Sequence, residues 1–448
     1  MRRARRPLTT TALLAATALT LAACSPGSDD SSGESGSGEG GTTVTVRLWD
    51  EVAAEAYETS FDAFTEQNPD ITVEVEVIPW ADYWTQLPLD VQSGDMADIF
   101  WTNTSNFGTY ADNGTLIDID EALGEDHDEW EQSVVDLYTR DGVNYGVPQL
   151  WDSIALFYNA ELVEEAGIDV EDLQWRPGAG EGDTLLEAAT ALTTDSEGRH
   201  PGEDGFDGGA RETYGFNSQA DLQAIYVDFL AQNGALFQDP ETDGFAFDSP
   251  EGIEAFQYLV DLVNTHEVAP SAADTNVNGD FSRDLFVQGD LGLFQSGPYS
   301  LPHIAENADF EWGIAPMVGG PEGRIGVVHG VAAVGNAESE HLDATTEVLR
   351  WLGSAEGQAP LGETGAAFPG AVDAQQGYID YWAEQGVDVS VFVDAAQEPT
   401  APSPIGAEIN AGSNVITPIF QDMFLGAIPV EEALAQAQEE GNAEMGIE

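Results

Sequence analysis

Three tryptophans in the first third of the chain are each accompanied by short polar side chains. The groups are Trp49 with Asp50, Trp101 with Asn103, Ser105 and Asn106, and Trp151 with Asp152. A flat indole face beside a hydrogen-bond acceptor suits a sugar-like ring, which has C–H groups on its faces and hydroxyl groups around its rim. Core packing is the commoner role for one tryptophan, but three repeats of the same arrangement favour a binding site.

The same residue types leave two other kinds of chemistry open. An aromatic ring beside a carboxylate also suits a cationic or zwitterionic solute, such as a polyamine or a betaine. A secreted glycoside hydrolase would use aromatic side chains to hold its substrate and two carboxyl groups to cleave it. Because the chain has 82 Asp and Glu residues, nearly every segment offers a carboxylate, and no catalytic pair can be identified from spacing.

The three groups follow segments with the pattern of β-strands. Hydrophobic alternation predicts strands over 43–48, 71–78 and 97–101, with helices over 51–67 and 83–92 between them. This order predicts a doubly wound, mainly parallel sheet. Trp49 follows the first of these strands, Trp101 ends the third, and Trp151 follows an extended segment over 145–150. In open α/β sheets, ligands bind at the edge formed by the carboxyl ends of the strands.

Later segments continue the α/β pattern. We expect helices over 161–167, 184–192, 222–232, 250–265 and 342–352, and a hairpin over 239–247. With 448 residues, of which 42% are hydrophobic, the chain is long enough for two to three domains.

The charge of the chain excludes several classes of function. All 12 basic residues are arginines, so chemistry that depends on lysine is excluded, and the net charge is -70. Nucleic-acid binding is not expected, because phosphate neutralisation needs clustered basic residues. The six histidines lack metal-ligand spacing, and the single cysteine allows neither an internal disulfide nor a cysteine-ligated metal. We expect no cofactor.

The first 24 residues have the pattern of an export signal. Four arginines precede an apolar stretch over 8–21, and Leu21-Ala22-Ala23-Cys24 resembles a lipobox. We predict a signal peptide over 1–23, lipidation of Cys24, and a flexible linker over 24–42. The protein would then be anchored to the outer face of the cell membrane through its lipid alone. The alternative is a plain signal peptide with an incidental cysteine.

Several motifs, in their order along the chain, resemble those of the extracellular solute-binding proteins of carbohydrate ABC importers, the maltose-binding-protein-like group. The motifs are GDMADIFW (94–101), DGVNYGVP (141–148), ALFYN (155–159), YGF (214–216) and FVQGDLGLFQSGPY (286–299). The resemblance extends over essentially the whole mature chain.

This resemblance implies a two-lobed α/β fold of the type II-like periplasmic-binding-protein kind, with a doubly wound, mainly parallel sheet in each lobe and the ligand cleft between lobes. The implied crossings lie near 150–153, 326–330 and 366–370. The implied lobes are 43–150 with 331–366, and 151–330 with 367–448. It further implies a monomeric protein that is not an enzyme, and that captures a sugar or oligosaccharide and delivers it to a membrane permease by hinge closure.

The resemblance also assigns roles to individual residues. It places Trp101, Ser105 and Asn106 at ligand-contacting positions, Asp152 at a hydroxyl-binding position, and Tyr299 at a stacking position. His329 lies at an implied crossing, where it could face the cleft. Tyr299 stands where the family usually has tryptophan, and the loop after Trp101 differs from the maltose-binding form, so the identity of the sugar stays open.

Two acidic segments resemble calcium loops. The segment from Asp239 to Gly244 lacks the acid expected at position 12, where Pro250 stands, so a hairpin is the better interpretation. The second candidate is a loop whose carboxylates could surround Ca²⁺, with an acidic surface loop as the alternative. Its residues are Asp195, Glu197, Asp204 and Asp207.

The excess of acidic residues predicts that the protein works in concentrated salt. Without residues 1–23 the chain keeps 82 acidic and 8 basic residues, a net charge of -74. Such a surface is expected of a halophilic protein, because concentrated salt screens the repulsion between carboxylates.

Overall fold

The computed structural model describes residues 41–447 except 179, 241, 398 and 407. The predicted signal peptide, Cys24 and nearly all of the predicted linker lie outside the described residues. Within the described part, no helix is both long enough and apolar enough to cross a membrane.

The first sheet contains five strands in the order β2-β1-β3-β13-β6. Its strands are β1 Thr42–Leu48, β2 Ile71–Val77, β3 Ile99–Asn103, β6 Val147–Asp152 and β13 His329–Gly335. β1 pairs in parallel with β2 and with β3, as the βαβαβ pattern predicts. β13 runs antiparallel to both β3 and β6, so β6 points in the same direction as β1. The prediction of a parallel order therefore holds for the first three strands, and the returning strand β13 breaks it.

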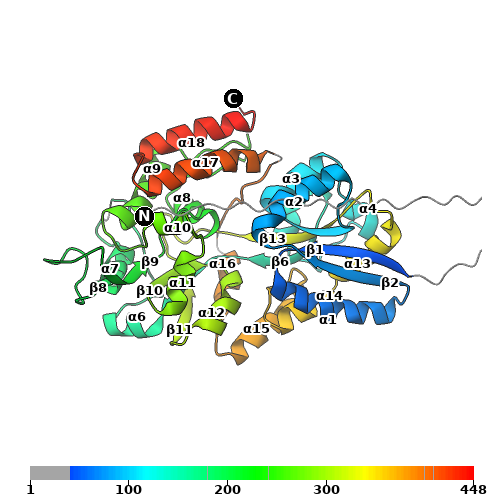
Figure 1. Ribbon diagram of the computed structural model, residues 1–448, viewed down its shortest axis with the longest axis horizontal. Coiled ribbons are helices and arrows are strands. Elements are labelled where there is room, and N and C mark those ends of the chain that lie inside the picture. Colours follow the sequence, from blue (N-terminus) through cyan, green and yellow to red (C-terminus); the bar gives the residue numbers. More distant parts are fainter. Residues whose placement is uncertain (1–40, 179, 241, 398, 407, 448) are drawn as a thin grey trace, which may run out of the picture. The chain divides into compact units, whose positions relative to one another are not determined.

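Helices cover both faces of this sheet. α1 (Glu51–Gln67) begins at Asp50, whose side chain accepts hydrogen bonds from the backbone N–H groups of the first turn, and it buries Tyr57 and Phe64. α2 (Trp80–Ser93) ends at Gly94, which adopts a left-handed φ of 78°. Figure 1 shows α1 with α14 along one face and α2 with α3 along the other. The remaining elements on this side are α3 Thr104–Asp112, α4 Ile119–Leu123, α5 Gln132–Leu137, β4 Thr139–Arg140, β5 Val143–Asn144, α13 Leu342–Leu352, α14 Ala355–Glu363 and η3 Val372–Ala374.

The second sheet has the order β11-β7-β10-β9-β8. Its strands are β7 Ala155–Asn159, β8 Thr194–Asp195, β9 Arg211–Phe216, β10 Leu291–Ser296 and β11 Trp312–Pro316. Among these described strands only β9 and β10 pair in parallel. The expectation of a mainly parallel second sheet is therefore wrong, because β7 runs antiparallel to both of its neighbours.

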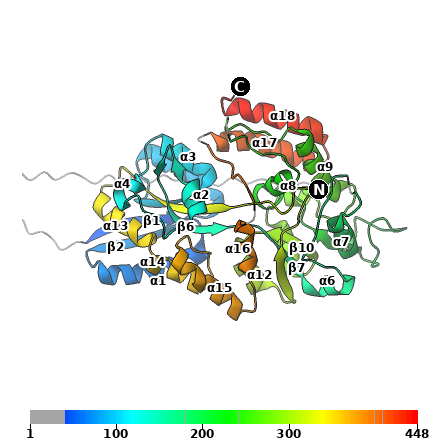
Figure 2. The same ribbon diagram turned by 180° about the vertical axis from the view of Figure 1, so that it is seen from behind.

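The helices beside the second sheet enclose the larger hydrophobic core, in which Trp175 packs against Phe229. Figure 2 shows α9, α17 and α18 stacked together on this side. The elements are α6 Ala160–Ala166, α7 Thr184–Leu192, the π-helical turn η1 Leu222–Tyr226, α8 Val227–Gln232, α9 Pro250–Asn264, α10 Ala272–Thr275, α11 Phe281–Gln288, η2 Pro298–Ser300, α12 Leu301–Asn307, α17 Ile409–Phe424 and α18 Val430–Glu444.

The chain passes between the two sheets at several points. Only Ser153 and Ile154 separate β6 in the first sheet from β7 in the second. On the return, β12 (Gly326–Val327) pairs with β14 (Thr400–Ala401) directly before β13 begins. α15 (Gln375–Glu384) packs on α14, whereas α16 (Ser390–Gln397) packs on β7 and β11. The lobe boundaries stay a prediction, and η3 and α15, both within the predicted second lobe, pack on α14 of the first.

Candidate functional site

One edge of the first sheet collects the polar residues that the sequence analysis singled out. Because β1, β3 and β6 share one direction and β13 opposes them, the carboxyl ends of the first three lie beside the amino end of β13. Asp50 therefore follows β1, Asn103 ends β3, and Asp152 ends β6 at the same edge. His329, at the start of β13, is the register partner of Asp152.

Two of the three predicted tryptophans are buried inside strands. β3 continues to Asn103, two residues beyond its predicted end, and the side chain of Trp101 is completely buried against Tyr57 of α1. Trp151 lies within β6 and is buried against Phe368, with 4.6 Å between the ring centroids. Direct ligand contact by Trp101 is therefore not supported, because its ring belongs to the core between sheet and helix.

Trp49 is different, because it is partly exposed and lies at the centre of an aromatic cluster. Its ring centroid lies 5.2 Å from that of Trp80, 5.3 Å from that of Trp84 and 5.1 Å from that of Trp101. Trp80 is the first residue of α2 and 52% of its surface is exposed. The sequence analysis missed Trp80, because it placed the start of this helix at Tyr83, and it did not single out Trp84. The position of Trp80 shortly after a strand was the signal that could have identified it.

The loop after β3 forms a hydrogen-bonded amide pair. Asn103 Oδ1 caps α3 by accepting from the backbone N–H of Asn106 at 3.1 Å, and it accepts from Asn106 Nδ2 at 2.7 Å. Asn106 Oδ1 accepts in turn from the side chain of Asn410, on α17. Ser105 lies partly buried in the first turn of α3. Asn410 could not be found from sequence, since 304 residues separate it from Asn106.

Asp152 has a partly buried carboxyl group that accepts a hydrogen bond from a residue beside the second sheet. The amide of Gln223, in η1, donates to its Oδ1. Burial raises the pKa of Asp152 to about 8, although the hydrogen bond from Gln223 opposes this shift. Burial also lowers the pKa of His329 to about 4, so its imidazole is neutral at pH 7, and its Nε2 is buried without a partner among the described residues.

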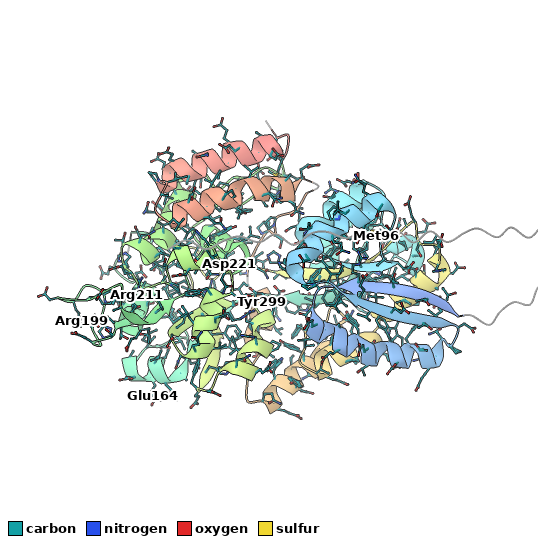
Figure 3. The ribbon with its side chains drawn as sticks, in the orientation of Figure 1. Met96, Glu164, Arg199, Arg211, Asp221 and Tyr299 are labelled. Carbon is teal, nitrogen blue, oxygen red and sulfur yellow. The ribbon has the colours of Figure 1, made fainter. Side chains whose placement is uncertain are left out.

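Tyr299 and Asp221 face the same region from the second sheet. Tyr299 follows β10, and 48% of its surface is exposed. Asp221 caps η1, where its Oδ1 accepts from the backbone N–H of Ala224 at 2.7 Å. Desolvation and the nearby carboxylates of Asp221 and Asp152 raise the pKa of Tyr299, so its hydroxyl remains a donor. Figure 3 labels Tyr299 and Asp221. The sequence analysis predicted Tyr299 but not Asp221.

The site combines aromatic faces, amides and carboxyl groups with little positive charge. No described arginine forms an ion pair with Asp152 or Asp221, and the chain has no lysine. An anion would therefore find no positive charge from these groups, and the ionised form of either carboxyl group would repel it. A ligand that carries hydroxyl groups, or a positive charge, is chemically compatible with this set of groups.

The predicted calcium loop is held by an arginine. Asp195 is buried, and its carboxylate accepts from the backbone N–H groups of Glu197 and Asp207 and from the guanidinium of Arg199. Burial raises the pKa of Asp195, but these hydrogen bonds outweigh burial and lower it well below its usual value. Asp204 and Asp207 are exposed, and the described residues contain no cluster suited to a metal ion. The calcium hypothesis is therefore not supported, because Arg199 supplies the positive charge.

Comparisons with known proteins agree with this architecture. The family profile of bacterial extracellular solute-binding proteins matches residues 46–359. The M. tuberculosis protein UspC is 45% identical in its crystal structure, which covers 90% of this chain and 100% of UspC with a TM-score of 0.75. The maltodextrin-binding protein MdxE of Bacillus subtilis is 26% identical over 70% of this chain and 68% of MdxE.

A further solved structure shares the fold. An ABC substrate-binding protein from Listeria monocytogenes, in complex with cycloalternan, is 22% identical, with a TM-score of 0.78 over 91% of this chain and 100% of that protein. The family profile matches more than half of the chain. This chain therefore belongs to the family of bacterial extracellular solute-binding proteins.

Proposed function

We propose that this protein is the substrate-binding lipoprotein of an ABC importer, which captures a sugar or oligosaccharide between its two lobes. The observation that carries the proposal is the first sheet's edge, where partly exposed Trp49 and Asp50 share one side with Asp152 and His329. Pyranose faces suit indole rings, and hydroxyl groups suit carboxyl and amide groups. Maltodextrin and cycloalternan are named as ligands of two relatives, which supports the same class here.

Hinge closure would deliver the ligand to the membrane permease. Asp152 comes from the first sheet, whereas Gln223 and Tyr299 come from elements beside the second. A sugar that hydrogen-bonds to both sides at once stabilises the conformation in which they approach each other. The proposed protein acts as a monomer and binds its ligand without converting it. Lipid attached to Cys24 would hold it at the outer face of the membrane.

The proposal is tested by thermal unfolding of the mature protein with three ligand sets. These are neutral oligosaccharides, polyamines and betaines. A ligand at 100 times its Kd stabilises the fold by about 2.7 kcal/mol. We expect stabilisation by a sugar, and stabilisation by cations alone would contradict the proposal. Chromatography of the bound sugar after long incubation tests the absence of hydrolysis, and recovery of shortened products would assign an enzyme.

The acidic surface is proposed as an adaptation to salt. The mature chain has a net charge of -74, and each arginine among residues 41–447 already contacts an acidic side chain or a backbone carbonyl. At 1 M salt the screening length falls to about 3 Å, which removes most repulsion between exposed carboxylates. We expect the melting temperature to rise strongly between low and molar salt. An unchanged melting temperature would contradict the adaptation.

A further inference from the structure

We propose that Arg140 is the cation that lets two strongly acidic lobes close on each other, so that ligand capture by this protein strengthens as salt rises. This inference rests on the proposed function and adds its control by ionic strength. The predicted lobe 43–150 with 331–366 has 30 acidic and 3 basic residues, and the predicted lobe 151–330 with 367–448 has 48 and 5. Their net charges of -27 and -43 repel each other, and closure brings these charges closer together.

The two lobes meet at a seam between α3 and α17. Asn106 Oδ1, on α3, accepts from the side chain of Asn410, on α17. The loop that carries Asp243 is tied to the segment before α17, because Gln238 Nε2 donates to the backbone carbonyl groups of Asp243 and Ile405, both at 2.7 Å. The exposed carboxylate of Asp243 is therefore held on the side of the second lobe that meets α3.

Arg140 supplies positive charge on the first-lobe side of this seam. It ends β4, and its guanidinium donates to both carboxylate oxygens of Asp112, the last residue of α3. These hydrogen bonds raise the pKa of Arg140, and the charges of Asp141 and Asp243 raise it further, although burial opposes them. Arg140 thus attracts carboxylates from both lobes, and without it these three carboxylates would lose their shared counter-charge.

Dissolved ions can reach this seam. The side chains of Arg140 and Asp112 are 29% and 37% exposed, and a cavity of about 440 Å³ beside them is also lined by Asp141 and Tyr145. Exposed charges act over about 10 Å at about 0.1 M salt, and over about 3 Å at about 1 M. Low salt therefore leaves the lobes repelling each other, with Arg140 as a local offset. Molar salt removes most of this repulsion, which favours the closed conformation and so strengthens ligand binding.

Calorimetric titration of the mature protein at increasing salt tests this control. The probe is the tightest binder among glucose, maltotriose, mannotriose and diacetylchitobiose. The variant is Arg140→Gln, and Arg350→Gln is the matched control, because it removes the same charge from the same predicted lobe. Arg350 is half exposed, and its ion pair is with Glu347 of its own helix, α13. Circular dichroism at each salt concentration confirms that all three proteins are folded.

We expect the Kd of the unmodified protein to fall by about threefold or more between about 0.1 M and about 1 M salt. Arg140→Gln should raise Kd by about threefold to fivefold at the lower salt, as for the loss of a partly exposed ion pair, and by less than about twofold at the higher. Arg350→Gln should follow the unmodified protein. A Kd that stays constant or rises with salt would overturn the inference, and so would equal Kd values for the two variants. In both cases the proposed function stands.

Small-angle X-ray scattering without ligand separates this inference from the proposed function. The radius of gyration should fall as salt rises, and that of Arg140→Gln should stay larger than that of Arg350→Gln at the lower salt. Because the proteins share one linker, the difference between them reports on the lobes. If no sugar binds at any salt, the proposed function fails, and a radius that follows salt in this way still supports charge-controlled closure. Identical radii for the two variants at the lower salt would overturn it.

Discussion

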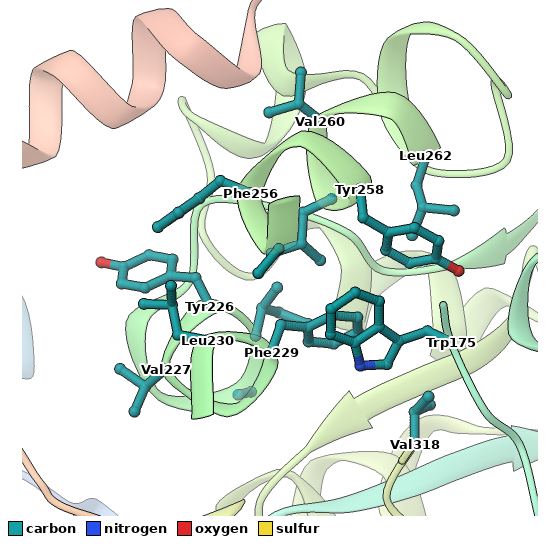
Figure 4. Packing of buried hydrophobic residues seen from close by; sticks show 14 of the residues in the cluster. Trp175, Tyr226, Val227, Phe229, Leu230, Phe256, Tyr258, Val260, Leu262 and Val318 are labelled. Carbon is teal, nitrogen blue, oxygen red and sulfur yellow. The ribbon is translucent and has the colours of Figure 1, made fainter. Parts of the chain in front are cut away.

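Trp175 beside the second sheet and Trp49 at the edge of the first each lie at the centre of an aromatic cluster. Trp175 is completely buried, with ring centroids 5.1 Å from Phe229 and 4.9 Å from Tyr258. Figure 4 shows these three rings within the buried cluster. Its Nε1 donates to Gln232 Oε1 at 2.8 Å. In the Trp49 cluster, by contrast, Trp80 is half exposed, and the Nε1 atom of Trp84 is buried without a partner in the described residues.

This difference separates a structural cluster from a candidate binding cluster. Buried polar groups in a stable core are nearly always hydrogen-bonded, because an unpaired group costs about 1–3 kcal/mol. The indole of Trp175 meets that requirement, whereas Trp84 Nε1, Trp151 Nε1 and His329 Nε2 beside the first sheet have no partner among the described residues. Asp183 Oδ2 and Asp228 Oδ2 beside the second sheet are unpaired as well, so the exposure of Trp80 separates the two clusters more clearly than unpaired atoms do. We infer that the first cluster contributes mainly to folding and the second mainly to ligand binding.

The largest expected effect is on the structural side of this comparison. Trp175→Ala removes a completely buried indole and leaves the amide oxygen of Gln232 without its donor. We expect it to lower the free energy of unfolding by about 3–5 kcal/mol. Trp80→Ala, which removes an exposed ring, should lower it by less than about 1 kcal/mol. Denaturant unfolding of both variants measures the two values, and equal losses would contradict the division.

A smaller effect is expected on the binding side. Asp152→Ala removes the carboxyl group that ends β6 and that Gln223 contacts across from the other sheet. We expect sugar affinity to fall by about tenfold or more, equivalent to about 1.4 kcal/mol. Asp95→Asn, at an exposed carboxylate after α2, is the control and should bind normally. Calorimetry with the best sugar from the thermal screen provides the measurement, and unchanged binding in Asp152→Ala would place the site elsewhere.

The smallest expected effect is a change in pH dependence. Because burial raises the pKa of Asp152 to about 8, the folded state binds a proton there that the unfolded state releases above about pH 4. This group therefore makes the protein less stable as pH rises from about 4 to 8. Asp152→Asn should remove that contribution, so its free energy of unfolding should fall less than that of the unmodified protein between pH 5 and pH 8.

Other buried carboxyl groups make this comparison necessary. Burial also raises the pKa of Asp183 and Asp228, and both remain in the variant, so only the difference between the two proteins reports on Asp152. Parallel pH curves for the two proteins would show that Asp152 titrates normally.

Much of the first sheet could be predicted from the sequence, because strand and helix periodicities differ strongly there. The helix over 51–67 was predicted to the residue, and the strand over 71–78 to within one residue. The prediction that polar residues after these strands share an edge is consistent with the strand directions. The burial of Trp101 was not predicted, because it depends on β3 continuing for two more residues.

The rest of the site depends on contacts that sequence spacing does not encode. Asp221 and Gln223 reach Asp152 and Tyr299 only after two sheets have formed and the chain has crossed between them. Arg199 pairs with Asp195 four residues away, and this ion pair occupies a carboxylate that the calcium hypothesis needed as a ligand. Trp80 was missed for a local reason, since the predicted helix began three residues late.

The most direct test of the central claim is a crystal structure of the mature protein with its tightest-binding sugar or oligosaccharide. The account predicts that the ligand contacts Trp49 and lies within hydrogen-bond distance of Asp152 and near Tyr299. A ligand bound at any place other than this edge of the first sheet would contradict it.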